Sequence, residues 1–148
     1  MTNIQTKIAE LQSTSLMDLL IDQCSDLEAL LALARREVLA AEKSDFRELI
    51  SVVSERATLG ERLESYHRQI AELRGSMAQR SSASDAVSTQ SIRLAIEIQT
   101  LDADTTRLLT TTRNEVGRSI TRLDDGRRNF TAYLRDGRAN GLSCDTRA

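Results

Sequence analysis

The chain has 148 residues, a formal net charge of −2, two Phe, two Tyr, no Trp and no Pro. So few aromatic side chains argue against the bulky core of a globular enzyme, and so small a net charge argues against electrostatic steering of a partner. Because proline breaks helices, its absence favours long uninterrupted helices.

A first helix is predicted from Ser13 or Thr14 to Lys43 by apolar side chains that recur every three or four positions. Asp18, Asp22 and Asp26 fall in its expected early turns, where the helix dipole favours acidic groups. The predicted buried stripe is close to a heptad repeat and comprises Leu16, Leu20, Gln23, Leu27, Leu30, Ala34, Val38 and Ala41.

A break is predicted near 44–45, because Asp45 followed by Glu48 resembles a capping box at the start of a helix. The segment 14–79 is therefore expected to be a helical arm, and the sequence leaves open whether the arm is one kinked helix or two. The stripe after the break comprises Phe46, Leu49, Val53, Ala57, Leu59, Leu63, Tyr66, Ile70, Leu73 and Met77.

A Ser-rich linker is predicted at 80–86, where Ser84 or Asp85 would cap the next helix. A long return helix is expected over 87–135, followed by a flexible tail over 136–148 that contains Gly137 and Gly141. The stripe of the return helix comprises Leu94, Ile98, Leu101, Thr105, Leu108, Thr112, Val116, Ile120, Leu123, Arg127, Phe130 and Leu134.

These elements predict a single all-α domain over 1–148. The expected architecture is a long antiparallel helical hairpin or bundle of about three helices with coiled-coil-like packing, in which the third helix returns antiparallel along the first two.

Catalytic and metal-binding chemistry is not indicated. His67 is the only histidine, and Cys24 and Cys144 have no spacing typical of metal ligands. No phosphate-binding loop or nucleophile motif occurs, so the sequence predicts neither an enzyme nor a cofactor.

Location and nucleic-acid binding are judged from charge and hydropathy. The N-terminal residues are polar and no run approaches the roughly 18 apolar residues of a membrane span, so a cytoplasmic protein is expected. Arginines are frequent after 107, but acidic residues interrupt them, and Asp124 with Arg128 is predicted to form an ion pair one helical turn apart. This interleaving favours a solvated face over a nucleic-acid interface.

Half of the aromatic residues stand close together near the end of the third segment. Phe130, Tyr133 and Leu134 precede the predicted tail, in which Leu142 is a further apolar residue. Two interpretations stay open: these side chains pack on a neighbouring helix, or they form an exposed amphipathic end that docks a helix of another protein.

The segment from Asp26 to Leu73 resembles the FlgN-type flagellar export chaperones. Its matching features are an early leucine-rich stripe, a small residue followed by Asp that opens a second helix, and an acidic–basic pair followed by leucines. The end of the chain, from Tyr133 to Arg138, is similar to the Tyr-x-x-x-Gly stretch that often closes such chains. Two departures are Arg56, where Lys is commoner, and the Ser-rich linker. The matching residues are Leu27, Leu30, Leu31, Ser44, Asp45, Leu49, Glu55, Arg56, Leu59 and Leu63.

The resemblance implies a cytoplasmic export chaperone for hook–filament junction subunits of the FlgK and FlgL type. Such a chaperone covers a terminal helix of its client, prevents premature assembly and aids delivery to the flagellar type III export apparatus, whose components are possible further partners. The client-binding residues it implies are Phe130, Tyr133 and Leu134, supported by Ile120, Leu123 and Leu142. The alternative is a coiled-coil adaptor or oligomerisation module without a role in export, and a homo-oligomer is compatible with either function.

Overall fold

The computed structural model describes residues 2–76 and 82–144, all of which outside one short turn are helical. Within this part of the chain there are three helices and no strand: α1 (Thr2–Glu42), α2 (Phe46–Ser76) and α3 (Ser82–Cys144). The predicted all-α fold is confirmed. The chain divides into two compact units, Met1–Leu108 (unit 1) and Leu109–Ala148 (unit 2), so α3 contributes its first part to unit 1 and its remainder to unit 2.

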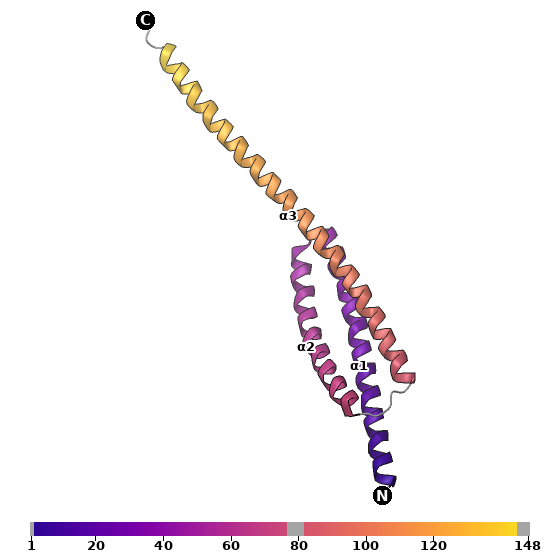
Figure 1. Ribbon diagram of the computed structural model, residues 1–148. Coiled ribbons are helices and arrows are strands. Elements are labelled where there is room, and N and C mark those ends of the chain that lie inside the picture. Colours follow the sequence, from indigo (N-terminus) through magenta and orange to yellow (C-terminus); the bar gives the residue numbers. More distant parts are fainter. Residues whose placement is uncertain (1, 77–81, 145–148) are drawn as a thin grey trace. The chain divides into compact units, whose positions relative to one another are not determined.

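The predicted break near 44–45 separates two helices, because the chain reverses its direction there (Figure 1). The Asp45 N–H donates to the Ala40 carbonyl at 2.8 Å, and the Ser44 N–H donates to the Ala41 carbonyl at 3.1 Å. Together with the left-handed conformation of Ser44, at φ 55°, these two bonds form a Schellman motif that ends α1.

Asp45 also begins α2, because its Oδ1 accepts a hydrogen bond from the Glu48 N–H at 3.1 Å. The predicted capping box is thus half formed. The Asp45 N–H is already bonded to α1, and the Glu48 carboxylate instead accepts two hydrogen bonds from Arg36, at 2.7 and 3.0 Å. One residue therefore serves both the end of α1 and the start of α2.

Replacing Ser44 by glycine is expected to stabilise unit 1 by about 1 kcal/mol, because only glycine adopts the left-handed conformation without steric cost. Urea unfolding measures the change. Ser51 is a matched control, since it is exposed in the interior of α2, where a change to glycine should destabilise by about 0.5 kcal/mol. Equal effects at the two positions would contradict the role given to Ser44.

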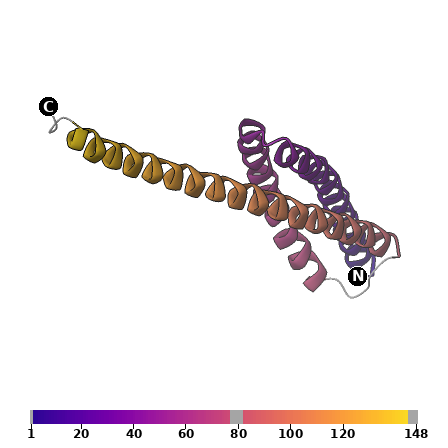
Figure 2. The same ribbon diagram turned by 90° about the horizontal axis from the view of Figure 1, so that it is seen from above.

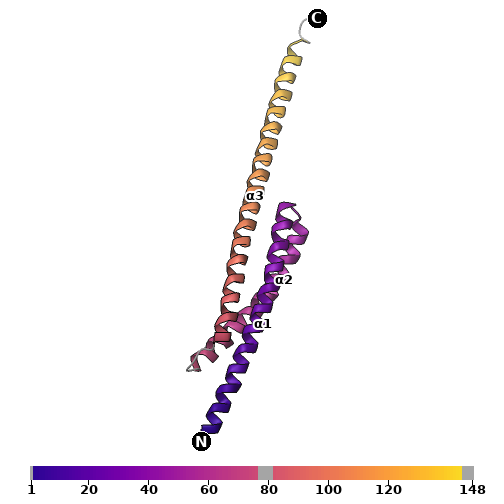
Figure 3. The ribbon, with the colours of Figure 1, turned by 90° about the vertical axis from the view of Figure 1, so that its right-hand side faces the viewer.

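Unit 1 is a bundle of α1, α2 and the first part of α3 (Figures 1 and 2). Leu20 of α1 packs with Ile70 of α2, whereas Glu37, later in α1, pairs with Arg56, earlier in α2, so these two helices are antiparallel. Arg56 of α2 reaches Asp102 of α3, whereas Arg74 reaches Ser88, so α3 is antiparallel to α2 as well. It follows that α3 runs parallel to α1, which Figure 3 also shows. The prediction that the third helix returns antiparallel to both earlier helices is therefore wrong for α1, because the chain already reverses between α1 and α2.

The core of unit 1 is thin and aliphatic, as the composition predicts. One cluster joins α1 and α3 through Leu31, Ala34, Leu94 and Ile98. The other joins α1 and α2 through Leu16, Leu20 and Ile70. Because α1 packs on two helices, its buried residues form a wider band than one stripe and also include Leu33, Ala40 and Ala41.

The predicted stripe of α2 is wrong in its first turns. Phe46 and Val53 are about half exposed, whereas Val52 is completely buried. The bonds that end α1 fix the rotation at which α2 starts, and this rotation turns Leu49 and Val52 toward α1. The acidic residues from Asp18 to Asp26 lie in the middle of α1 rather than in its early turns, because the helix already begins at Thr2.

Two arginines of α2 join the helices of unit 1 where the apolar core is thin. Arg56 donates to both carboxylate oxygens of Asp102 in α3, at 2.7 and 2.9 Å, and also forms an ion pair with Glu37 of α1. Arg62 forms a two-point ion pair with Asp26, whose side chain is only 10% exposed. The hydrogen bonds to Asp102 raise the pKa of the Arg56 guanidinium, so this guanidinium stays charged at any physiological pH.

Helix α3 extends beyond the predicted range at both ends, since it begins at Ser82 and continues to Cys144. Residues 77–81 and 145–148 lie outside the described residues, and they include the end of the predicted arm, the start of the predicted linker and the end of the predicted tail. None of the helices in the described ranges combines the length and apolar character needed to cross a membrane.

Candidate protein-binding face

The candidate site is one face of α3 in unit 2, which we call the C-terminal stripe. It continues the three- and four-residue spacing that buries Leu94, Ile98 and Thr105 in unit 1. Since an amphipathic helix of this kind normally buries its apolar face, the stripe is the surface of unit 2 most suited to a partner. The stripe comprises Thr112, Val116, Ile120, Leu123, Arg127, Phe130 and Leu134.

Every described side chain from 113 to 136 is exposed. The exposed fraction is 61% for Ile120, 75% for Leu123 and 62% for Phe130, and Tyr133 beside the stripe reaches 73%. Side chains of this size seldom stay exposed together in a protein that has no partner. In unit 2 these side chains are exposed, which is the condition that docking on another molecule requires.

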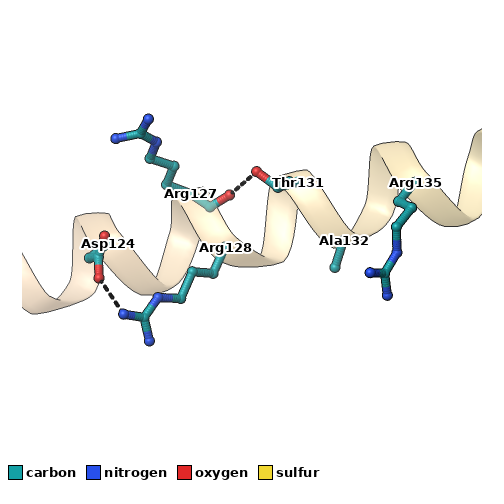
Figure 4. A pocket seen from close by; sticks show the side chains of 6 residues that line it. All are labelled: Asp124, Arg127, Arg128, Thr131, Ala132 and Arg135. Atoms are coloured by element: carbon teal, nitrogen blue, oxygen red, sulfur yellow. Dashed lines mark hydrogen bonds and ion pairs between the residues drawn. The ribbon is translucent and has the colours of Figure 1, made fainter.

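Three arginines of α3, which we call the basic margin, gather at this surface, Arg127 within the stripe and Arg128 and Arg135 beside it (Figure 4). Arg127, Arg128 and Arg135 surround a shallow depression of about 340 Å³ together with Asp124, Thr131 and Ala132. Asp124 accepts a hydrogen bond from Arg128 at 3.0 Å, which confirms the predicted ion pair one turn apart. The depression is too open for a small molecule, but its arginines can meet acidic side chains of a helix lying on the stripe.

The structure places five of the six predicted site residues on or beside one exposed surface. Ile120, Leu123, Phe130 and Leu134 belong to the C-terminal stripe, and Tyr133 borders it. Leu142 lies within α3, but its side chain is outside the described residues. The sequence pattern does not identify the basic margin as part of this surface, because the acidic residues between its arginines favour a solvated charged face.

Unit 1 contains a second depression, a groove of about 320 Å³ between its three helices. His67 and Arg74 lie at it, and its walls are mainly apolar residues such as Leu20, Leu63 and Ile70. The Ser91 hydroxyl is buried in this groove and forms no hydrogen bond with the described residues. His67 itself is exposed. Among the described residues, no group of three His, Cys, Asp or Glu side chains is placed to bind a metal ion.

Comparison with known proteins found no family model, no curated protein and no solved structure that matches this chain. The resemblance to the FlgN-type chaperones therefore rests on the residues quoted above.

Proposed function

We propose that the protein is a non-enzymatic, cytoplasmic export chaperone that binds hook–filament junction subunits of the flagellum. The observation that carries the proposal is the C-terminal stripe, a row of large exposed apolar side chains on a helix that packs on no other helix among the described residues of unit 2. A client helix that is itself amphipathic would cover this row in the way that helices of a bundle cover one another.

The energetics of such a complex are favourable but not extreme. Burial of Phe130, Tyr133 and Leu134 can contribute roughly 1.5–3 kcal/mol for each side chain, before the cost of ordering the client. Arg127, Arg128 and Arg135 would select clients whose apolar face is bordered by Asp or Glu. A reversible complex of this kind suits a chaperone that must release its client to the export apparatus.

Truncation after Asp125 tests the proposal, because it removes the aromatic end and leaves all of unit 1. We expect the truncated protein to remain helical and to lose binding of purified junction subunits, as measured by calorimetry. Unchanged affinity in a well-folded truncated protein would place the client site elsewhere.

The second candidate function is a coiled-coil adaptor, which the same exposed stripe also suits. The two functions differ in the fate of the aromatic end. An adaptor would bury Phe130 and Tyr133 in a stable homodimer and would not bind junction subunits, whereas the chaperone needs both rings accessible to the client.

A further inference from the structure

The charges that border the C-terminal stripe are arranged symmetrically about one point of α3. Glu115 and Arg122 are seven positions apart, two helical turns, and lie along one edge of the stripe. Arg113 and Asp124 are eleven positions apart, three turns, and lie along the other edge. Both pairs have the same midpoint, between residues 118 and 119, and each pair consists of one basic and one acidic residue.

The side chains of the stripe share nearly the same centre. The midpoint of Val116 and Ile120 is residue 118, and the midpoint of Thr112 and Leu123 lies within one residue of it. In an antiparallel pair of identical helices, a residue before the centre of one helix faces the residue that lies equally far after the centre of the other helix. Each edge of the stripe also faces the same edge of the second helix. This helix is therefore complementary to itself in the antiparallel orientation, in both its apolar layers and its charges.

We propose that a second copy of this chain occupies the stripe between Leu109 and Arg127, antiparallel to the first and centred near residue 118. In this dimer Val116 packs on Ile120 of the second copy, and Glu115 pairs with its Arg122. Arg113 pairs with Asp124 of the second copy. The symmetry repeats each contact, so two apolar layers and four ion pairs surround the centre.

The position of Arg127 favours the antiparallel over the parallel orientation. A parallel dimer in register would place Arg127 of one copy against Arg127 of the other within the apolar stripe, where like charges repel. In the antiparallel dimer Arg127 lies opposite Leu109 at the end of the paired segment, where its guanidinium can reach water while its stem covers the leucine. Between Leu109 and Arg127 the chain has four arginines against three acidic residues, so repulsion between the copies is small.

The length of the paired segment follows from burial in unit 1. The stripe before Leu109 is already used there, since Leu94, Ile98 and Thr105 are buried. A symmetric dimer that starts at Leu109 must end at Arg127, its counterpart across the centre. Phe130, Tyr133 and Leu134 lie beyond this end and are not among the proposed contacts, so the dimer goes beyond the proposed function and does not depend on it.

Sedimentation of the full-length chain across the micromolar range tests the dimer, with E115R and R122E as the variants. Each single reversal puts like charges together at two equivalent contacts, and we expect each to weaken dimerisation by about tenfold or more. An equimolar mixture of E115R and R122E should recover a heterodimer, because every Glu–Arg contact is restored with the charges exchanged. R118E is the control, since Arg118 lies on the opposite face of the helix and its reversal should leave dimerisation unchanged.

Three results would overturn the proposal: a wild-type chain that stays monomeric, single variants that dimerise as well as the wild type, or a mixture that fails to recover the dimer. Circular dichroism of each variant shows whether the helices are intact. Loss of the dimer in the Phe130→Ala, Tyr133→Ala double variant would also contradict it, because those rings lie outside the paired segment. Binding of junction subunits is measured separately, so failure of the dimer and failure of the chaperone function can be distinguished.

Discussion

The double change Phe130→Ala and Tyr133→Ala is expected to weaken binding of a junction subunit by roughly 2–4 kcal/mol, which is a factor of about 30 to 1,000 in the dissociation constant. Both rings are more than 60% exposed, so their removal creates no cavity in the free protein. The effect should therefore appear in binding and not in stability. Calorimetry measures the affinity, and circular dichroism measures the helicity.

Ile92 and Ile96 provide a matched control for this pair. They are exposed apolar residues of the same helix, at 61% and 58%, but they belong to unit 1 and lie off the C-terminal stripe. Their joint replacement by alanine should leave client affinity unchanged. An equal loss in both double variants would show that binding follows exposed apolar area in general rather than the aromatic end.

Replacing Arg56 by methionine is expected to destabilise unit 1 by about 2–3 kcal/mol. The arginine side chain is 19% exposed and its partner Glu37 is 12% exposed, so the change leaves a largely buried carboxylate without its cation. Asp102 is 42% exposed and can turn to water, which keeps the loss below that of a fully buried pair. Urea unfolding measures the difference.

Arg35 is the control for Arg56, because it also joins two helices through an ion pair. Its contact with Glu97, at 2.6 Å, has exposed fractions of 61% and 49%. A change to methionine there should cost about 0–1 kcal/mol. The Arg56→Lys variant should fall between the two, since lysine keeps the charge but cannot bond both oxygens of Asp102 in the same way. Equal costs at Arg35 and Arg56 would contradict the central place of Arg56.

Periodicity predicted the helices and the buried residues of α3, because apolar spacing records which face of a helix is covered. Leu94, Ile98 and Thr105 are buried as expected. The start of α1 was missed because residues before Ser13 look polar, yet Ile4, Ile8 and Leu11 are themselves spaced four and three positions apart. In α2 Leu49 and Ile70 are buried as predicted, but Val52 is buried in place of Val53. The rotation of the first turns is set by the bonds that end α1, which periodicity within α2 does not contain.

The residues of the candidate site could be predicted from the sequence, but the exposure of their side chains could not. The aromatic cluster is visible in the sequence, whereas its exposure depends on which helices the chain places beside it. The contacts of Arg56 were not predictable either, since Glu37 and Asp102 are far from it in sequence and meet it only in the folded bundle. The sequence does not show which carboxylates pair with Arg56, because the acidic residues follow no regular spacing along their helices.

Hydrogen exchange of the full-length chain, with and without a purified junction subunit, tests most directly whether the C-terminal stripe binds the client. The client should slow exchange of backbone amides from about 128 to 136, beyond the segment paired in the dimer, and leave those of α1 and α2 unchanged, because helix docking stabilises the segment that it covers. Protection confined to α1 and α2, or no protection at any client concentration, would contradict the account.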